Sequence, residues 1–116
     1  MATAGTHDII IDQGARWSLA FTWQDSNGDP VDLTGYTISA QVRTTYADSG
    51  GTLLAEATAT ITDEAGGEFT LSIPAATTEA MTPGSWLWDV EADPGDGEVE
   101  RLVMGRAIVR AEVTRD

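Results

Sequence analysis

Hydrophobic and polar residues alternate along most of the chain with a period of two, the pattern of β-strands that bury one face. The alternation is clear in residues 17–23, 38–43, 69–73 and 86–91, and it continues with smaller side chains in 54–62. The apolar members of the four clear segments are Trp17, Leu19, Phe21, Trp23, Ile38, Ala40, Val42, Phe69, Leu71, Ile73, Trp86, Trp88 and Val90. We therefore expect these side chains to form the core of an all-β protein.

Two more segments near the chain ends also read as strands. The run Ile9-Ile10-Ile11 predicts a short strand, and residues 98–113 are long enough for two strands or for one strand bent at Gly105. Glycine- and proline-containing turn signals separate the segments at nearly regular spacing. Only residues 75–81 favour a helix, of at most one short turn. Seven to eight short antiparallel strands arranged in this way predict a sandwich or a barrel.

Composition and charge narrow the class of protein. The 116 residues suit one domain, which we expect to span residues 1–116 with a flexible segment at 1–6. The chain has no cysteine, so disulfides and thiolate zinc sites play no part. Nineteen acidic residues face six basic ones, and the net charge of −13 disfavours nucleic acid and anionic membranes as partners. The first residues lack the features of a signal peptide, so we expect synthesis in the cytoplasm.

The acidic run Asp25-Ser26-Asn27-Gly28-Asp29 resembles the first half of a helical calcium-binding loop, because Asp25, Asn27 and Asp29 match its first three ligand positions. The position that should supply a bidentate glutamate is Tyr36, and the flanking residues have strand periodicity. A turn between two strands with Asn-Gly at its tip explains the same residues. We interpret the run as a turn and expect no metal site.

Residues suited to catalysis are scarce. The single histidine, His7, stands close to the start of the chain, and no nucleophile is evident that it could activate. Asp89 and Glu91 could in principle act as an acid and a base, but their spacing on a strand is more typical of an exposed pair. The glycine pairs at 50–51 and 66–67 lack the lysine and helix of a phosphate-binding loop. We expect no catalytic residues, no cofactor and no enzymatic activity.

The four tryptophans allow two interpretations. Exposed on one face, they could stack on sugar rings, as in a carbohydrate-binding module that contacts a host surface glycan. Trp17, Trp86 and Trp88 lie in phase with the other apolar residues of their strands, however, and this favours a place in the core. Trp23 lies at a strand end beside a polar loop and is compatible with both interpretations.

The order of several motifs resembles a known family. The motifs are DQGARWSLAFTW at 12–23, NGDPVDLTGYT at 27–37, AQVR at 40–43, PGSWLWDVE at 83–91 and RLVMGRAIVRAEVTR at 101–115. Together they resemble the small immunoglobulin-like proteins of tailed bacteriophages and are similar to the N-terminal domain of baseplate upper proteins, which attach receptor-binding parts to the tail. The resemblance covers almost the whole chain and consists of strand and turn patterns.

This resemblance implies an immunoglobulin-like antiparallel β-sandwich in which Leu33, Tyr36, Trp86, Trp88 and Asp89 are packing residues. It also implies a structural subunit of the virion, at the tail or baseplate or as a fibre-attachment adaptor, whose partners are other virion proteins. A capsid decoration protein is an alternative within the same class. The expected location is the virion, assembled in the bacterial host cytoplasm.

We expect such a subunit to form a homo-oligomer through its terminal strands, because the open edges of a sandwich invite a partner. Ile9, Ile10 and Ile11 are consecutive, so at least one of them should point outward. Arg106, Arg110 and Arg115 provide three of the six basic residues and are the natural counterparts of a neighbour's acidic loops. In the alternative interpretation, Ile10 lies under a loop and the arginines only neutralise their own domain.

Overall fold

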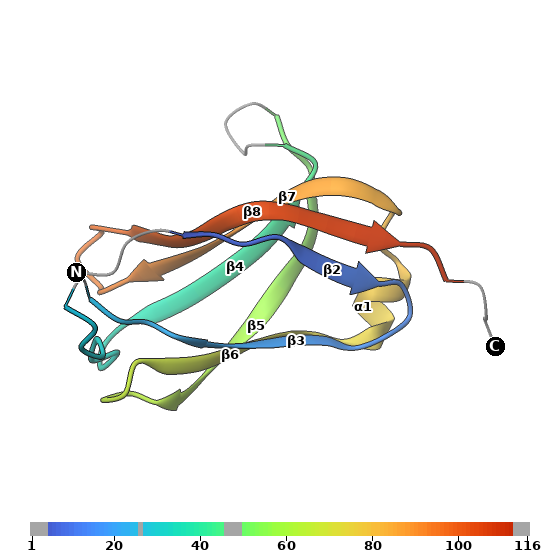
Figure 1. Ribbon diagram of the computed structural model, residues 1–116. Helices are drawn as coiled ribbons and strands as arrows, with labels where there is room; N and C mark the ends of the chain where they lie inside the picture. Colours follow the sequence, from blue (N-terminus) through green and yellow to red (C-terminus); the bar gives the residue numbers. More distant parts are fainter. Residues whose placement is uncertain (1–4, 26, 46–49, 113–116) are drawn as a thin grey trace.

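The computed structural model describes residues 5–25, 27–45 and 50–112 (Figure 1). Its elements are β1 (Gly5–Thr6), β2 (Ile9–Asp12), β3 (Trp17–Thr22), β4 (Thr37–Arg43), β5 (Leu53–Asp63), β6 (Glu68–Ile73), α1 (Ala75–Glu79), β7 (Gly84–Asp93) and β8 (Glu100–Arg110). The described chain is therefore all-β with one short helix, as the alternation predicts. Gly5 and Thr6, which we expected in a flexible terminus, form β1, and residues 1–4 of that segment lie outside the described residues.

The strands form one mixed sheet that curls until it nearly closes into a barrel (Figure 1). The order is β1-β8-β7-β4-β5-β6-β3, and β2 follows β1 along the same edge of β8, so the sheet has seven strand positions. Both β1 and β2 run parallel to β8, whereas all other neighbours are antiparallel. The expectation of a wholly antiparallel arrangement was wrong at this edge, because a period of two is the same for both strand directions.

Strand β5 joins the two halves of the barrel. Its first part pairs with β4 and its second part pairs with β6, so the strand crosses from one layer to the other. In Figure 1, β8, β7 and β4 form the upper layer and β3 and β6 the lower one, with β5 running between them. The inner face of β5 carries the small residues Ala55, Ala57 and Ala59, whose size lets the layers approach where the strand crosses.

The core confirms the faces that the alternation assigns to β4, β6 and β7. The side chains of Ile38, Ala40, Val42, Phe69, Leu71, Ile73, Trp88 and Val90 are all buried. Helix α1 connects β6 to β7 across one end of the barrel, and the hydroxyl of its buried Thr78 donates a hydrogen bond to the carbonyl of Ala15 (2.8 Å). This helix has five residues, and no helix in the described part of the chain is long and apolar enough to cross a membrane.

Residues 100–110 form one strand, which is irregular at Leu102. In the ladder between β7 and β8, Val90 pairs with Val103 and Glu91 pairs with Arg101, so Leu102 is an extra residue that has no partner. This bulge turns Leu102 into the core, where it is 6% exposed, and brings Arg101 to the outer face beside Glu91. The bulge could not be predicted from the pattern of residues, because Leu102 and Val103 are both apolar.

Gly105 is the place where the first and last strands approach most closely. A Cβ at this position would overlap the carbonyl of His7, which lies between β1 and β2. Trp88 is the pairing partner of Gly105 on β7, and its Nε1 donates a hydrogen bond to that same carbonyl oxygen (2.7 Å). The Trp88 indole therefore bonds to the backbone of His7 from inside the core. The His7 carbonyl occupies the space that the missing side chain of Gly105 leaves open.

The Trp88 ring is also in contact with three aromatic residues from two other segments. Its centroid lies 6.1 Å from that of Trp17, 6.3 Å from that of Phe21 and 6.4 Å from that of His7. Trp17 and Phe21 belong to β3 in the opposite layer, so Trp88 holds the two layers together as well as the edge.

We predict that Trp88→Ala lowers the free energy of unfolding by about 3 to 5 kcal/mol, because it leaves a large cavity and an unpaired carbonyl. A domain of this size has a total stability of about 5 to 15 kcal/mol, so the variant should unfold at much lower denaturant concentration. Trp86→Ala is the control, since Trp86 lies only partly buried on the same strand. Similar urea midpoints for Trp88→Ala and the parent would contradict this role.

Candidate functional site

The outer face of β2 and β8 carries an apolar pair between charged residues. Ile10 and Ile108 are partners in the parallel ladder and are 52% and 38% exposed. On the same face, Asp12 follows Ile10 along β2, while Arg106 and Arg110 flank Ile108 along β8. We call these five residues the edge stripe. Clustered exposed apolar side chains at an open sheet edge are typical of an interaction surface.

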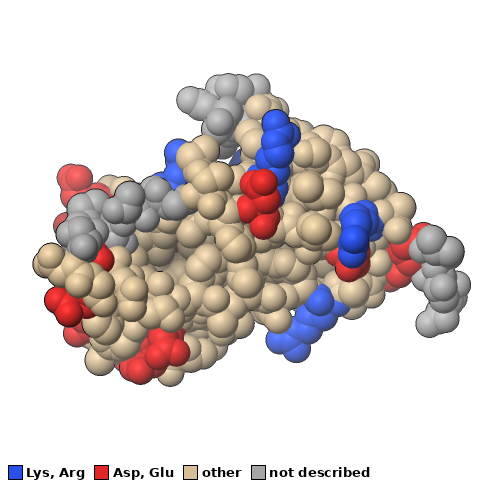
Figure 2. Space-filling model, viewed as in Figure 1, with Lys and Arg blue, Asp and Glu red and all other residues tan. Residues whose placement is uncertain are grey.

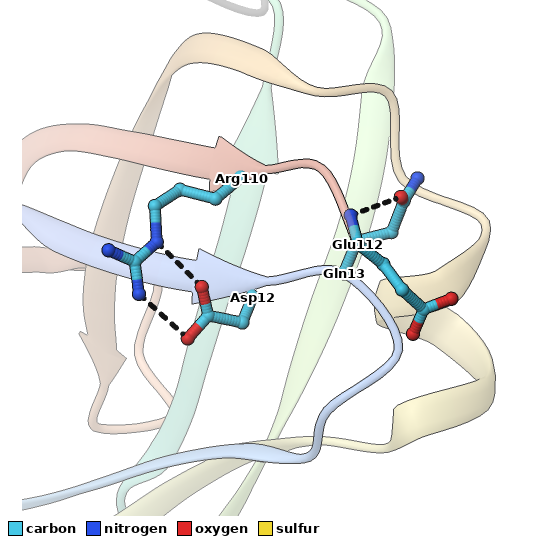
Figure 3. A network of polar contacts seen from close by, with 4 residues as sticks. All are labelled: Asp12, Gln13, Arg110 and Glu112. Atoms are coloured by element: carbon cyan, nitrogen blue, oxygen red, sulfur yellow. Dashed lines mark hydrogen bonds and ion pairs between the residues drawn. The ribbon is translucent and has the colours of Figure 1, made fainter. Parts of the chain in front are cut away.

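Asp12 and Arg110 form a two-pronged ion pair across the stripe. The Nε and Nη2 atoms of Arg110 donate to the two carboxylate oxygens of Asp12 at 2.6 and 3.0 Å (Figure 3). These hydrogen bonds lower the pKa of Asp12 and raise that of Arg110. Both side chains remain more than half exposed, so the pair contributes little to stability but fixes where the charges lie.

Gln13, the next residue after β2, fastens this end of the stripe. Its Oε1 accepts a hydrogen bond from the backbone N–H of Glu112 (3.1 Å; Figure 3). Its Nε2 donates to the carbonyl of Met81 (3.0 Å). One amide side chain thus joins the end of β2, the segment after β8 and the segment after α1. The backbone at this end of the edge stripe is therefore held in place by hydrogen bonds to two other segments.

The residues predicted to make an interface differ in their exposure. Ile9 and Ile11 are 4% and 0% exposed in the core, so their side chains are not available to a partner, whereas Ile10 points outward. The alternative in which Ile10 lies under a loop is therefore wrong, but Arg110 does neutralise an acid of its own domain. Arg106 is exposed and donates to the hydroxyl of Ser85 (3.1 Å). Arg115 lies outside the described residues.

Sequence reasoning missed Ile108 and Asp12. Alternation within 106–110 places Ile108 in phase with both arginines, and this signal could have revealed it. The partnership of Asp12 with Arg110 joins residues 98 positions apart and follows only from the parallel register.

Charges are unevenly spread over the surface. In Figure 2, basic and acidic side chains lie next to each other over β2 and β8, while acidic side chains gather at the end of the barrel that carries the turn between β5 and β6. The edge stripe is therefore close to neutral in a chain whose net charge is −13. Two copies of the protein would repel each other less at this face than at the acidic end.

A pocket of about 310 Å³ with polar and apolar lining residues lies farther along the outer face, over β4, β7 and β8. Its lining is Gln41, Arg43, Thr45, Leu87, Trp88, Asp89, Glu91, Arg101, Met104 and Gly105. Arg43 donates to the side-chain oxygen of Gln41 and to the carbonyl of Gly51, both at 3.0 Å. The bulge at Leu102 supplies Arg101 to the other side of the pocket. Hydrogen-bond donors and acceptors thus face one another across a small hollow.

Asp89 lies between the two arginines of this pocket. Its Oδ2 is 3.4 Å from Nε of Arg101, and its side chain is 33% exposed. Burial raises the pKa of Asp89 above its usual 3.8, and this effect outweighs the attraction of Arg101 and Arg43, which lowers it. Asp89 and Glu91 do share the outer face of β7 as predicted, but Asp89 is less exposed than we expected of such a pair.

The tryptophans are mainly packing residues. Trp88 and Trp23 are 4% and 6% exposed, and Trp23 packs edge-on against Tyr36 with ring centroids 5.4 Å apart. Trp17 and Trp86 are partly buried, and Nε1 of Trp86 donates to the carbonyl of Thr82 (2.8 Å). The four rings therefore do not form a shared surface platform for sugars.

Asp25, Asn27, Gly28 and Asp29 form the turn that we predicted, and Ser26 lies outside the described residues. Oδ1 of Asp25 accepts hydrogen bonds from the N–H groups of Asn27 (2.9 Å) and Asp29 (3.0 Å), and Gly28 has a φ of 84°. These bonds lower the pKa of Asp25, with the one from Asp29 contributing most. That the turn holds no calcium stays a prediction, which equal melting temperatures in chelator and in calcium would support.

Comparisons with known proteins identify no family. No protein-family model matches the sequence, and no curated protein matches it. The fold is similar to part of an endo-fucoidan hydrolase from glycoside hydrolase family 107, with a TM-score of 0.52 and 13% identity over 93% of this chain. A variant of that enzyme gives the same values. The chain spans 13% of the length of the hydrolase, so the likeness shows a shared fold and carries no activity with it.

We predict that replacing Asp89 with asparagine shifts the pH dependence of stability. A folded-state pKa above 3.8 means that the parent loses stability as the pH rises from 3.8 through that raised pKa, whereas the variant has no carboxyl to ionise. The melting temperature of Asp89→Asn minus that of the parent should therefore become more positive between acid and neutral pH. A difference that becomes more negative over this range would mean that attraction to Arg101 outweighs burial.

Proposed function

We propose that the protein is a structural subunit of a tailed bacteriophage virion, located at the tail or baseplate, that acts by self-association and by docking to neighbouring virion proteins. The proposal starts from the order of motifs along the sequence, which resembles immunoglobulin-like phage proteins. It includes no active site and no cofactor. A capsid decoration protein would use the same kind of surface and is the nearest alternative.

We further propose that the nearly closed barrel is an immunoglobulin-like sandwich. Such a fold has two antiparallel sheets joined by crossing connections. Strands β3, β6 and the second part of β5 would form one sheet, and β4, β7 and β8 the other. The passage of β5 between the layers joins the two sheets on one side, and the two sheet edges, β2 beside β8 and β3 beside β6, lie on the other.

The observation that carries the functional proposal is the exposed pair Ile10 and Ile108. Ile10 lies on the edge strand β2, which has a neighbour on one side only, and Ile108 lies beside it on β8. Sheet edges in monomeric proteins are commonly blocked by charge, proline or a bulge. Here exposed isoleucines lie on the edge strand β2 and on its neighbour β8, which favours contact with another protein surface.

A second candidate function, carbohydrate binding, is favoured by the outer pocket rather than by the tryptophans. Arg43, Arg101, Asp89 and Glu91 place donors and acceptors around a hollow at the lower end of the volumes that ligand sites have. A sugar with several hydroxyl groups could bond to both kinds of group. A glycan array that compares the parent with Arg101→Gln would test this function, because loss of binding in the variant would assign it to the pocket.

We predict that Ile10→Thr weakens self-association of the purified protein. Threonine keeps the branched shape suited to a strand but removes apolar surface from the edge. Val99→Thr is the matched control, because Val99 is 48% exposed and lies outside the edge stripe. In sedimentation velocity over a range of concentrations, the parent and Val99→Thr should associate alike and Ile10→Thr less. A parent that stays monomeric throughout would leave assembly to other virion proteins and remove self-association from the proposal.

A further inference from the structure

The two strands of the edge stripe carry opposite charges. The outward residues of β2 are Ile10 and Asp12, and those of β8 are Arg106, Ile108 and Arg110; the exposed Asp8 comes just before β2. Asp8 lies beside Arg106, whose backbone N–H donates to its Oδ1 (2.9 Å). The parallel register pairs Ile10 with Ile108 and Asp12 with Arg110. Acids thus line one strand, arginines line its neighbour, and isoleucines lie at the centre of both.

This separation of charge makes the face complementary to itself in one orientation. A two-fold axis that runs along the strands, midway between β2 and β8, places β2 of one copy over β8 of the other at the same level. Asp12 of one copy then faces Arg110 of the second copy, and Ile10 faces Ile108 of the second copy. Because the axis is two-fold, every such contact occurs twice.

The other face-to-face two-fold arrangement is unfavourable. An axis across the strands would place β2 over β2 and β8 over β8, so acids would oppose acids and arginines would oppose arginines. Ile10 would still meet an isoleucine, but the charges on both sides of it would repel. The charge pattern therefore selects the first arrangement.

We propose that two copies of this chain form a symmetric dimer through the edge stripe, with an axis along the strands that places β2 of each copy over β8 of the other. This inference rests on the self-association part of the proposed function and adds its partner, symmetry and register. The bidentate pair of Asp12 and Arg110 within each copy would become part of a network of four charged groups.

The dimer should be weak in free solution. Stable interfaces bury about 800 Å² on each partner, and the five side chains of the edge stripe offer less. In an assembly that holds many copies close together, such a contact gains from the high local concentration. Association of the purified protein is therefore expected to depend strongly on concentration.

Two opposite charge reversals test this arrangement. Arg110→Asp makes the stripe wholly acidic at this level, and Asp12→Arg makes it wholly basic, so each variant alone should repel its own copies and sediment as a monomer. When the two variants are mixed, each aspartate faces an arginine of the other chain. The mixture should therefore form a heterodimer that neither variant forms alone.

Matched variants and a folding check make each outcome decisive. Arg16→Asp and Glu98→Arg change the net charge by the same amounts in connecting segments outside the stripe, and both should dimerise like the parent. Melting curves of the two reversal variants should show a folded protein at the temperature of sedimentation. A parent that dimerises while both reversal variants still do so alone would overturn the inference and leave self-association standing at another surface. A monomeric parent would overturn both the proposed dimer and self-association. Two reversal variants that are monomeric alone and fail to form a heterodimer would overturn the proposed arrangement.

Discussion

The hydrogen bond from Nε1 of Trp88 to the carbonyl of His7 is the contact on which the edge of this protein depends. It requires Gly105, because any side chain there would occupy the place of the His7 backbone. With His7 fixed, the register of β2 against β8 follows, and with it the pairing of Ile10 with Ile108 and of Asp12 with Arg110. The same indole packs on Trp17 and Phe21 of the opposite layer. A core residue therefore determines how the proposed interaction surface is laid out.

The outer pocket also depends on a feature of the core. Leu102 enters the core as an extra residue in β8. The residues of β8 that precede it are therefore shifted by one position in their pairing with β7. The shift moves Arg101 to the outer face, where it reaches Asp89. The bulge lets two neighbours in sequence, Leu102 and Val103, both pack toward the core, so that Arg101 lies on the outer face. Regular alternation would have paired a different residue with Glu91.

The sequence predicted core residues correctly where one face of a strand is buried and the other is exposed to solvent. The period of two identified Ile38, Ala40 and Val42 as core residues, and likewise Phe69, Leu71 and Ile73, because burial alone decides that pattern. It left open the direction of β2, the bulge at Leu102 and the partner of Arg110, since each depends on contacts between distant segments. Trp23 illustrates the same limit, because its burial depends on contact with Tyr36. A polar loop connects the two residues, and the alternation pattern does not predict the path of that loop.

The parallel pairing of β2 with β8 has a mechanical consequence. Because the strands are neighbours and run in the same direction, a force that pulls the preceding segment of β2 away from the following segment of β8 acts along the strands and in opposite senses on the two. Such a force loads the ladder in shear, so its backbone hydrogen bonds resist together instead of opening one after another from an end. The Asp12–Arg110 pair and the Gln13 side chain cross the same seam and share that load. Tension between the chain ends would thus meet the most extensively cross-linked part of the edge first.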